Sequence, residues 1–154
     1  MIIKDFRQIS SIISRYEGYK MALKEAGKSV DENLIHNVDH VNYEEAKKGV
    51  LEKIKNGVKF DGIFATNDWM ALGAISALRE KKIKIPGEVK IVGFDNMSIS
   101  EITSPSITTI HQDSEKLGEY ATEILMGSIL KNDTEVKNIS VPVKLVKRKS
   151  TENK

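Results

Sequence analysis

The stretch that decides the fold runs from residue 60 to residue 96 and reads FDGIFATNDWMALGAISALREKKIKIPGEVKIVGFDN. It opens with a short apolar segment at residues 62–65, which is typical of a buried strand. Apolar residues then recur at three- and four-residue steps over residues 70–78, which predicts a helix. After a Pro-Gly turn, the apolar segment at residues 89–94 predicts another strand. This order of elements favours a parallel sheet covered by helices.

The same alternation continues on both sides of this stretch. Helical periodicity recurs at residues 11–26, 43–54 and 113–130. Extended segments are predicted at residues 2–3, 33–38, 107–110 and 139–146, and an irregular or short helical connection at residues 98–105. Pro142 in the last extended segment suits an edge strand or a crossing between lobes. The chain is therefore predicted to be an α/β protein with three layers, a mainly parallel sheet flanked by helices.

Composition excludes several classes of function. The 154 residues suffice for one domain with a core, and 24 basic against 22 acidic residues leave a net charge of +2. A nucleic-acid-binding surface usually has a clustered basic excess. The chain has two small basic clusters, Lys81-Lys82 with Lys84 and Lys147-Arg148-Lys149, which we interpret as solvated residues at helix ends or strand edges.

No motif for catalysis, metal binding or membrane insertion is found in the sequence. The absence of cysteine excludes disulfides and thiolate sites, and the three histidines have no metal-binding spacing. There is no Gly-x-Ser-x-Gly elbow and no Gly-x-x-x-x-Gly-Lys phosphate loop. No apolar run approaches the roughly 20 residues of a membrane span, and Lys4, Asp5 and Arg7 interrupt the apolar start. We expect no metal, no cofactor, no membrane contact and a cytoplasmic location.

Polar residues follow each predicted strand. Residues 66–68 (Thr-Asn-Asp) follow one strand, Asp95-Asn96 follow the next, and Asp39-His40 follow residues 33–38. Ligands of parallel sheets bind at the carboxyl ends of the strands, and carboxylates and amides can bind the vicinal hydroxyls of a sugar or another polyol. From the pattern alone, structural roles are favoured: a helix N-cap at Asn67 or Asp68, worth about 1 kcal/mol, and an Asp95-Asn96 turn. Trp69 could stack on a sugar ring or pack in a core or interface.

The central stretch resembles the signature core of the LacI/GalR family of bacterial transcription regulators. The resemblance rests on an Asn-Asp-x-Met-Ala-x-Gly helix start and a strand that ends in Gly-Phe-Asp-Asn: Asn67, Asp68, Met70, Ala71, Gly73, Pro86, Gly93, Phe94, Asp95 and Asn96. Further matches are Arg15-x-x-Gly18-Tyr19, PSITTIHQ at residues 105–112 and VPVKLVKRKST at residues 141–151. They cover nearly the whole chain.

This resemblance implies a type I periplasmic-binding-protein fold, in which two α/β lobes close on a ligand. It implies that Arg15, Asn67 and Asp95 contact sugar hydroxyls, which favours ligand binding over capping and turn formation, whereas Asp68 stays structural. His40 falls near a position often held by an aromatic residue that packs on the ligand, and Gln112 falls in the crossover. The family also implies a homodimer, with an interface formed by Met70, Leu72, Ile75, Ile99 and Ile102.

The resemblance also implies a division of the chain. Residues 1–111 are expected to form the C-terminal lobe, and residues 112–154 the crossover segment, with one helix of the N-terminal lobe and a returning strand. The helix at residues 113–130 is then expected to lack its packing partners. The helix-turn-helix domain of complete family members is not among these residues, so operator DNA would be bound only through that missing domain.

Three classes of function are considered. The first is the effector-sensing domain of a regulator, a repressor of a carbohydrate operon that responds to a sugar or sugar phosphate. The second is a sugar-binding protein of an uptake system, which shares the fold, and the third is an enzyme. The Asn-Asp-x-Met-Ala core and the Lys-Arg-Lys-Ser-Thr ending favour the regulator, and no nucleophile–base pair supports the enzyme.

Overall fold

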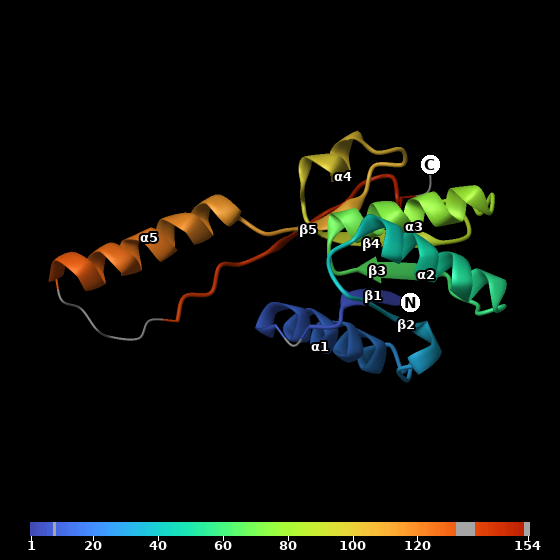
Figure 1. Ribbon diagram of the computed structural model, residues 1–154, viewed down its shortest axis with the longest axis horizontal. Coiled ribbons are helices and arrows are strands. Elements are labelled where there is room, and N and C mark those ends of the chain that lie inside the picture. Colours follow the sequence, from blue (N-terminus) through green and yellow to red (C-terminus); the bar gives the residue numbers. More distant parts are fainter. Residues whose placement is uncertain (8, 132–137, 153–154) are drawn as a thin grey trace.

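The computed structural model describes residues 1–7, 9–131 and 138–152, and contains one six-stranded sheet in the order β2-β1-β3-β4-β5-β6 (Figure 1). The strands are β1 (Ile2–Asp5), β2 (Ile35–Val38), β3 (Gly62–Ala65), β4 (Lys90–Asp95), β5 (Thr108–His111) and β6 (Lys144–Val146). The helices are α1 (Ser10–Glu25), α2 (Tyr43–Lys55), α3 (Asp68–Glu80), α4 (Ser98–Ile102) and α5 (Ser114–Lys131), and a short 3-10 turn, Glu32–Leu34, precedes β2. Strands β1 to β5 are parallel, and β6 pairs antiparallel with β5.

The sheet has helices on both faces, as the sequence predicts. Helices α2 and α3 cover one face, where Ile3, Ile63 and Ile91 are buried against Ile75 and Leu78. Side chains alternate between the faces of a strand, so Phe64 and Val92 point to the other face. Helix α1 lies on that face (Figure 1) and leaves a groove of about 770 Å³ beside Phe64 and Val92. The predicted three-layer α/β architecture is confirmed.

Strand β1 is longer and more central than the sequence pattern indicates. The predicted two-residue stub is a four-residue strand that pairs with both β2 and β3. Ile2 and Ile3 are completely buried, which explains the apolar start of the chain. Because β1 is parallel to β2 and β3, its carboxyl end, at Asp5, lies at the same edge of the sheet as the carboxyl ends of β2 and β3.

The last strand is shorter than predicted, and the segment after it is buried. Only Lys144–Val146 form β6, so Pro142 precedes the strand, and β6 is the predicted edge strand. Beyond it, Ser150 is completely buried. Its hydroxyl donates to Ile91 O at 2.6 Å and accepts a hydrogen bond from Thr108 N at 2.8 Å. The C-terminal segment is thereby fixed between β4 and β5.

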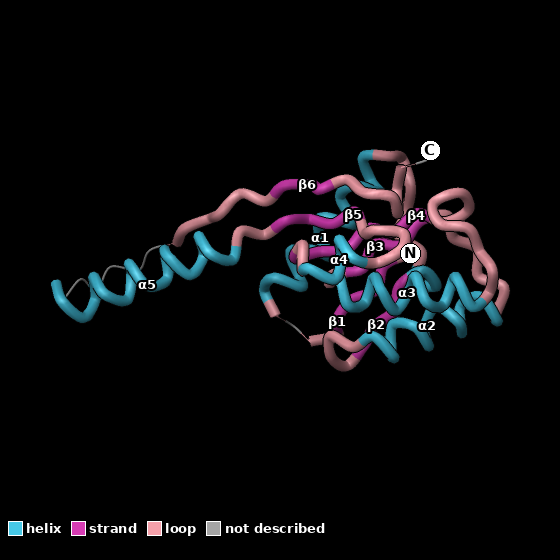
Figure 2. Tube along the Cα trace, turned by 90° about the horizontal axis from the view of Figure 1, so that it is seen from above, coloured by secondary structure: helices cyan, strands magenta, loops and turns pink. Residues whose placement is uncertain are grey.

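Helix α5 extends away from the layered body (Figures 1 and 2). It is connected to the body by the segments that leave β5 and return to β6 (Figure 2). Apolar side chains of the helix that the sequence predicts at residues 113–130 are exposed, among them Leu117 at 37% and Leu125 at 59%. No helix among the described residues is long and apolar enough to cross a membrane. The division at residue 111 stays a prediction, and part of its second range lies outside the described residues.

Two of the predicted interface residues are core residues. Met70 and Ile75 have no exposed surface and belong to the core beneath α3, so their assignment to a dimer interface is wrong. The family resemblance assigns the whole helix to the interface, but it does not say which of its apolar residues the sheet covers. Leu72 packs at the edge of this core, Ile99 is half-buried and Ile102 is 77% exposed. For these three residues the interface stays a prediction.

Candidate functional site

Two neighbouring parallel strands, β3 and β4, bring Asn67 and Asp95 together at their carboxyl ends. Asn67 lies two residues beyond β3, and Asp95 is the last residue of β4. The side-chain amide Nδ2 of Asn67 donates to Asp95 Oδ2 at 2.6 Å. The sheet topology therefore joins two residues that lie 28 positions apart in the chain.

Arg15 on α1 completes this group. Its Nη2 donates to Asp95 Oδ1 at 3.2 Å, and its Nη1 donates to Thr66 O at 2.7 Å. The guanidinium also lies 3.7 Å from the centroid of the Phe94 ring, a cation–π contact. The structure thus brings together three of the five predicted ligand residues, Arg15, Asn67 and Asp95, which we call the rim triad. Their contact with a ligand stays a prediction.

Asn67 has two roles at once. It is the N-cap of α3, and its Oδ1 accepts a hydrogen bond from Trp69 N at 2.8 Å. The capping role predicted from the pattern is therefore correct. It does not exclude a role at the triad, because an amide has a separate donor end and here that end faces Asp95. The cap fixes the direction in which the amide nitrogen points.

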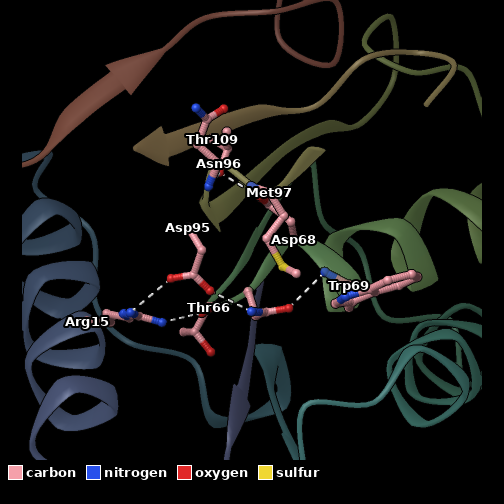
Figure 3. Close-up of polar contacts among 9 residues, drawn as sticks. Arg15, Thr66, Asp68, Trp69, Asp95, Asn96, Met97 and Thr109 are labelled. Carbon is pink, nitrogen blue, oxygen red and sulfur yellow. Dashed lines mark hydrogen bonds and ion pairs between the residues drawn. The ribbon is translucent and has the colours of Figure 1, made fainter. Parts of the chain in front are cut away.

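The predicted turn at Asp95 and Asn96 has an unusual backbone. Both residues have positive φ, 97° and 54°, a region that costs a non-glycine residue about 1–2 kcal/mol. This conformation points the Asp95 side chain toward Arg15 and the Asn96 side chain away from it (Figure 3). The Asp95 carboxylate accepts two hydrogen bonds, and its side chain remains 25% exposed. A carboxylate can accept about four hydrogen bonds, so Asp95 can accept further hydrogen bonds from a ligand.

The triad carries no net charge. Burial lowers the pKa of Arg15, while the Asp95 carboxylate opposes this shift and stabilises the charged guanidinium. The Arg15 side chain is only 13% exposed, so the ion pair is poorly screened by solvent. A positive and a negative group that compensate each other offer hydrogen bonds without attracting a strongly charged ligand.

Asp68 is buried beneath the turn and supports it. It has no exposed surface, and burial raises the pKa of its carboxyl group. Two hydrogen bonds oppose this shift: Met97 N donates to Oδ2 and the Thr109 hydroxyl donates to Oδ1, both at 2.7 Å. Gly93 allows this arrangement, because a Cβ there would lie 2.1 Å from Asp68 Oδ1. These contacts agree with the structural role expected for Asp68.

The ion pair of Asp5 and Arg7 at the end of β1 was not predicted from the sequence. Asp5 is completely buried, and Arg7 Nε donates to both of its carboxylate oxygens, at 2.9 and 2.8 Å. The Arg7 hydrogen bonds lower the pKa of Asp5 despite its burial. The adjacent Thr66 hydroxyl is buried without a partner in the described part of the chain. A strand prediction extended to residue 5 would have placed Asp5 at this edge of the sheet.

Arg148 is not the solvated residue that the sequence suggested. Its Nη1 donates to Ser100 Oγ and to Ile107 O, each at 3.1 Å, and its Nη2 donates to Asn96 Oδ1 at 3.0 Å. The interpretation is wrong for Arg148 because the following segment is buried between β4 and β5. The lysines of the two clusters are exposed, as the interpretation as solvated residues predicts: Lys81, Lys82, Lys84, Lys147 and Lys149.

The other two predicted ligand residues flank the triad without joining it. His40 is exposed two residues beyond β2, and Gln112 is half-buried one residue beyond β5. In the described part of the chain, neither makes a hydrogen bond or ion pair with Arg15, Asn67 or Asp95. Their ligand contacts stay predictions. The described residues also contain no group of three or more His, Cys, Asp or Glu side chains that could hold a metal ion.

A domain family described as "periplasmic binding protein-like domain" matches residues 1–151. The chain belongs to this family. Among curated relatives, it is 34% identical to the HTH-type transcriptional repressor PurR of Vibrio atlanticus over 90% of the chain. It is 37% identical to the HTH-type transcriptional regulator MalR of Clostridium butyricum, also over 90%. The chain spans 41% of each of these two relatives.

Solved structures agree with this assignment. The domain superposes on the transcriptional regulator CelR in its cellobiose complex with a TM-score of 0.91 at 28% identity, covering 97% of the domain and 45% of that chain. Superposition on a LacI-family regulator of Sanguibacter keddieii gives a TM-score of 0.90 at 29% identity. It covers 99% of the domain and 58% of that chain. The resemblance to the effector domain of LacI-family regulators, and the periplasmic-binding-protein-like fold, are confirmed.

Proposed function

We propose that this domain is the sugar-binding part of a LacI-type transcription regulator and that Arg15, Asn67 and Asp95 bind the sugar. The observation that carries the proposal is the rim triad, assembled from α1, β3 and β4 at the edge where parallel sheets bind ligands. The regulators among its relatives, and the cellobiose named with CelR, support the same function.

The chemistry of the triad suits vicinal hydroxyl groups. Asp95 can accept from two hydroxyls, while the second amide hydrogen of Asn67 can be donated to a hydroxyl oxygen. The compensated charges of Arg15 and Asp95 favour a neutral sugar over a sugar phosphate. Trp69 lies two residues after Asn67 and is 42% exposed, but its ring points away from Asp95 and Arg15 (Figure 3), so it would meet only a sugar that extends beyond the triad.

In the whole regulator, we propose that these residues form one wall of a cleft between two lobes. A sugar that binds the closed arrangement more tightly would shift the population toward it, and this difference in affinity is what regulation requires. Residues 1–111 would belong to one lobe and residues 112–154 to the crossover. We further propose a cytoplasmic homodimer that uses Leu72, Ile99 and Ile102, with operator DNA bound by another part of the protein.

The sugar-binding protein of an uptake system is the second candidate. It shares the two-lobed fold, so the triad alone does not distinguish it from a regulator. The HTH-type regulators among the curated relatives favour regulation, and they also favour a binding role over an enzymatic one.

Titration with small molecules tests the sugar site. Trp69 is the only tryptophan of the chain and lies in the first turn of α3, which Asn67 caps, so its fluorescence reports on ligands that bind near this helix start. We expect cellobiose, maltose or ribose to change the emission saturably and to raise the melting temperature, since a ligand at 100 times its Kd stabilises by about 2.7 kcal/mol. Glucose 6-phosphate should bind more weakly than the best neutral sugar, and L-leucine should not bind. Absence of binding by all three neutral sugars would refute the proposal.

A further inference from the structure

We propose that Arg148 is a positioning residue for the sugar site: it holds the Asp95–Asn96 turn in place from the C-terminal segment. This inference rests on the proposed function of Asp95. Arg148 does not contact the rim triad, and it acts through Asn96, whose Oδ1 accepts a hydrogen bond from Arg148 Nη2 at 3.0 Å.

The turn needs external support because of its backbone. Asp95 and Asn96 are consecutive residues with positive φ, and neither is glycine. Such a conformation persists only where surrounding contacts determine it. The direction of the Asp95 carboxylate toward Arg15 and Asn67 depends on this backbone, so whatever holds the turn also sets the geometry of the triad.

Asn96 is held by four hydrogen bonds, of which the longest is donated by Ser100 Oγ to Asn96 Oδ1 at 3.5 Å. Its backbone N donates to Thr109 Oγ1 at 3.3 Å, its Nδ2 donates to His111 Nδ1 at 3.2 Å, and its Oδ1 accepts from Arg148. Of these four bonds, the one from Arg148 has a charged donor, and such hydrogen bonds are roughly twice as strong as neutral ones. Both ends of the Asn96 amide are thus occupied on the side of the turn that faces away from Asp95.

Arg148 is itself rigidly placed. Its guanidinium is fixed by Ser100 Oγ and Ile107 O. Its backbone N donates to Thr108 Oγ1 at 2.8 Å, and the same hydroxyl donates to Arg148 O at 3.0 Å. A side chain with so many anchors can restrain the residue that it contacts.

The position of Arg148 links the turn to both crossover segments. Arg148 lies two residues beyond β6, and His111 is the last residue of β5. These two strands carry the segments that lead to α5 (Figure 2). The amide of Asn96 therefore connects the proposed sugar contact at Asp95 to both strands at once, so a shift of either strand would move the carboxylate.

A double-mutant cycle tests this inference. In Arg148→Met we expect the affinity for the best neutral sugar of cellobiose, maltose and ribose to fall by about three- to tenfold. Arg148→Lys should recover part of the loss, because it keeps the charge. In an Asn96→Gly background, the Arg148→Met change should have little further effect, since no amide remains to be held. Lys149→Met, on an exposed neighbour, is the matched control and should bind the sugar like the unmodified chain.

A measurement without sugar separates this inference from the proposed function. The HN–Hα coupling constants and Cβ chemical shifts of Asp95 and Asn96 should change in Arg148→Met and stay unchanged in Lys149→Met. Two results would overturn the positioning role. One is that the coupling constants stay unchanged in Arg148→Met. The other is that Arg148→Met lowers the sugar affinity equally in the unmodified chain and in the Asn96→Gly background. If no sugar binds the unmodified chain, the proposed function fails, and the couplings alone still decide whether Arg148 holds the turn.

Discussion

Replacing Asp95 with asparagine is expected to lower the affinity for a neutral sugar by about 10- to 100-fold while the domain stays folded. The carboxylate accepts hydrogen bonds from both Arg15 and Asn67. In asparagine one of these oxygens becomes an NH2 group, which would face a donor, and the charge that balances Arg15 is lost. Calorimetry or Trp69 fluorescence measures the affinity, and thermal unfolding checks the fold. Asparagine tolerates positive φ well, so the turn itself should survive.

Asp61→Asn is the matched control for this substitution. Asp61 is exposed and directly precedes β3, so it lies at the opposite end of the strand from Asn67. The control removes the same charge without touching the triad, and sugar affinity should be unchanged. Equal affinity in Asp95→Asn and Asp61→Asn would show that Asp95 does not bind the sugar.

The largest loss of stability is expected from Gly93→Ala. A Cβ at this position would lie 2.1 Å from Asp68 Oδ1 and 3.3 Å from Ile107 Cγ2. Asp68 cannot move away cheaply, because it is buried and bound to Met97 N and the Thr109 hydroxyl. We expect the free energy of unfolding in urea to fall by about 3 kcal/mol, at the upper end of the range for overpacked cores.

Gly62→Ala provides the comparison within the same sheet. Gly62 lies in the adjacent strand β3, and a Cβ there would meet only Lys90 O at 3.9 Å, an ordinary contact. Its free energy of unfolding should change by no more than about 1 kcal/mol. A Gly93→Ala variant as stable as Gly62→Ala would contradict the close approach of Asp68 to β4.

Much of the fold could be predicted because its signals are local. The helix of residues 70–78 has its own periodicity, and it appears as α3. The strand at residues 89–94 likewise appears as β4 with a shift of one residue at each end. Strand β1 was underestimated because its pairing partners, β2 and β3, follow much later in the chain, and no periodicity within four residues reveals them.

The site was less predictable, since it depends on contacts across the chain. Asn67 and Asp95 could be selected as residues that follow strands, but Arg15 was selected only through the family resemblance. Nothing in the local sequence distinguishes Arg148 from Lys147 and Lys149, although only Arg148 reaches Asn96. In the same way, Met70 and Ile75 satisfy an apolar helix pattern whether they face a partner or a core, and only the sheet beneath α3 decides.

We have proposed that a neutral sugar binds at the rim triad. Chemical-shift mapping of the isotope-labelled domain during a cellobiose titration tests it most directly. We predict that the largest shifts occur at the Asn67 side-chain amide, the Asp95 amide, Arg15 Nε and the Trp69 indole. If the largest shifts instead occur in the groove between α1 and the sheet, at Tyr19, Leu23, Phe64 and Val92, the sugar binds elsewhere and the account is contradicted.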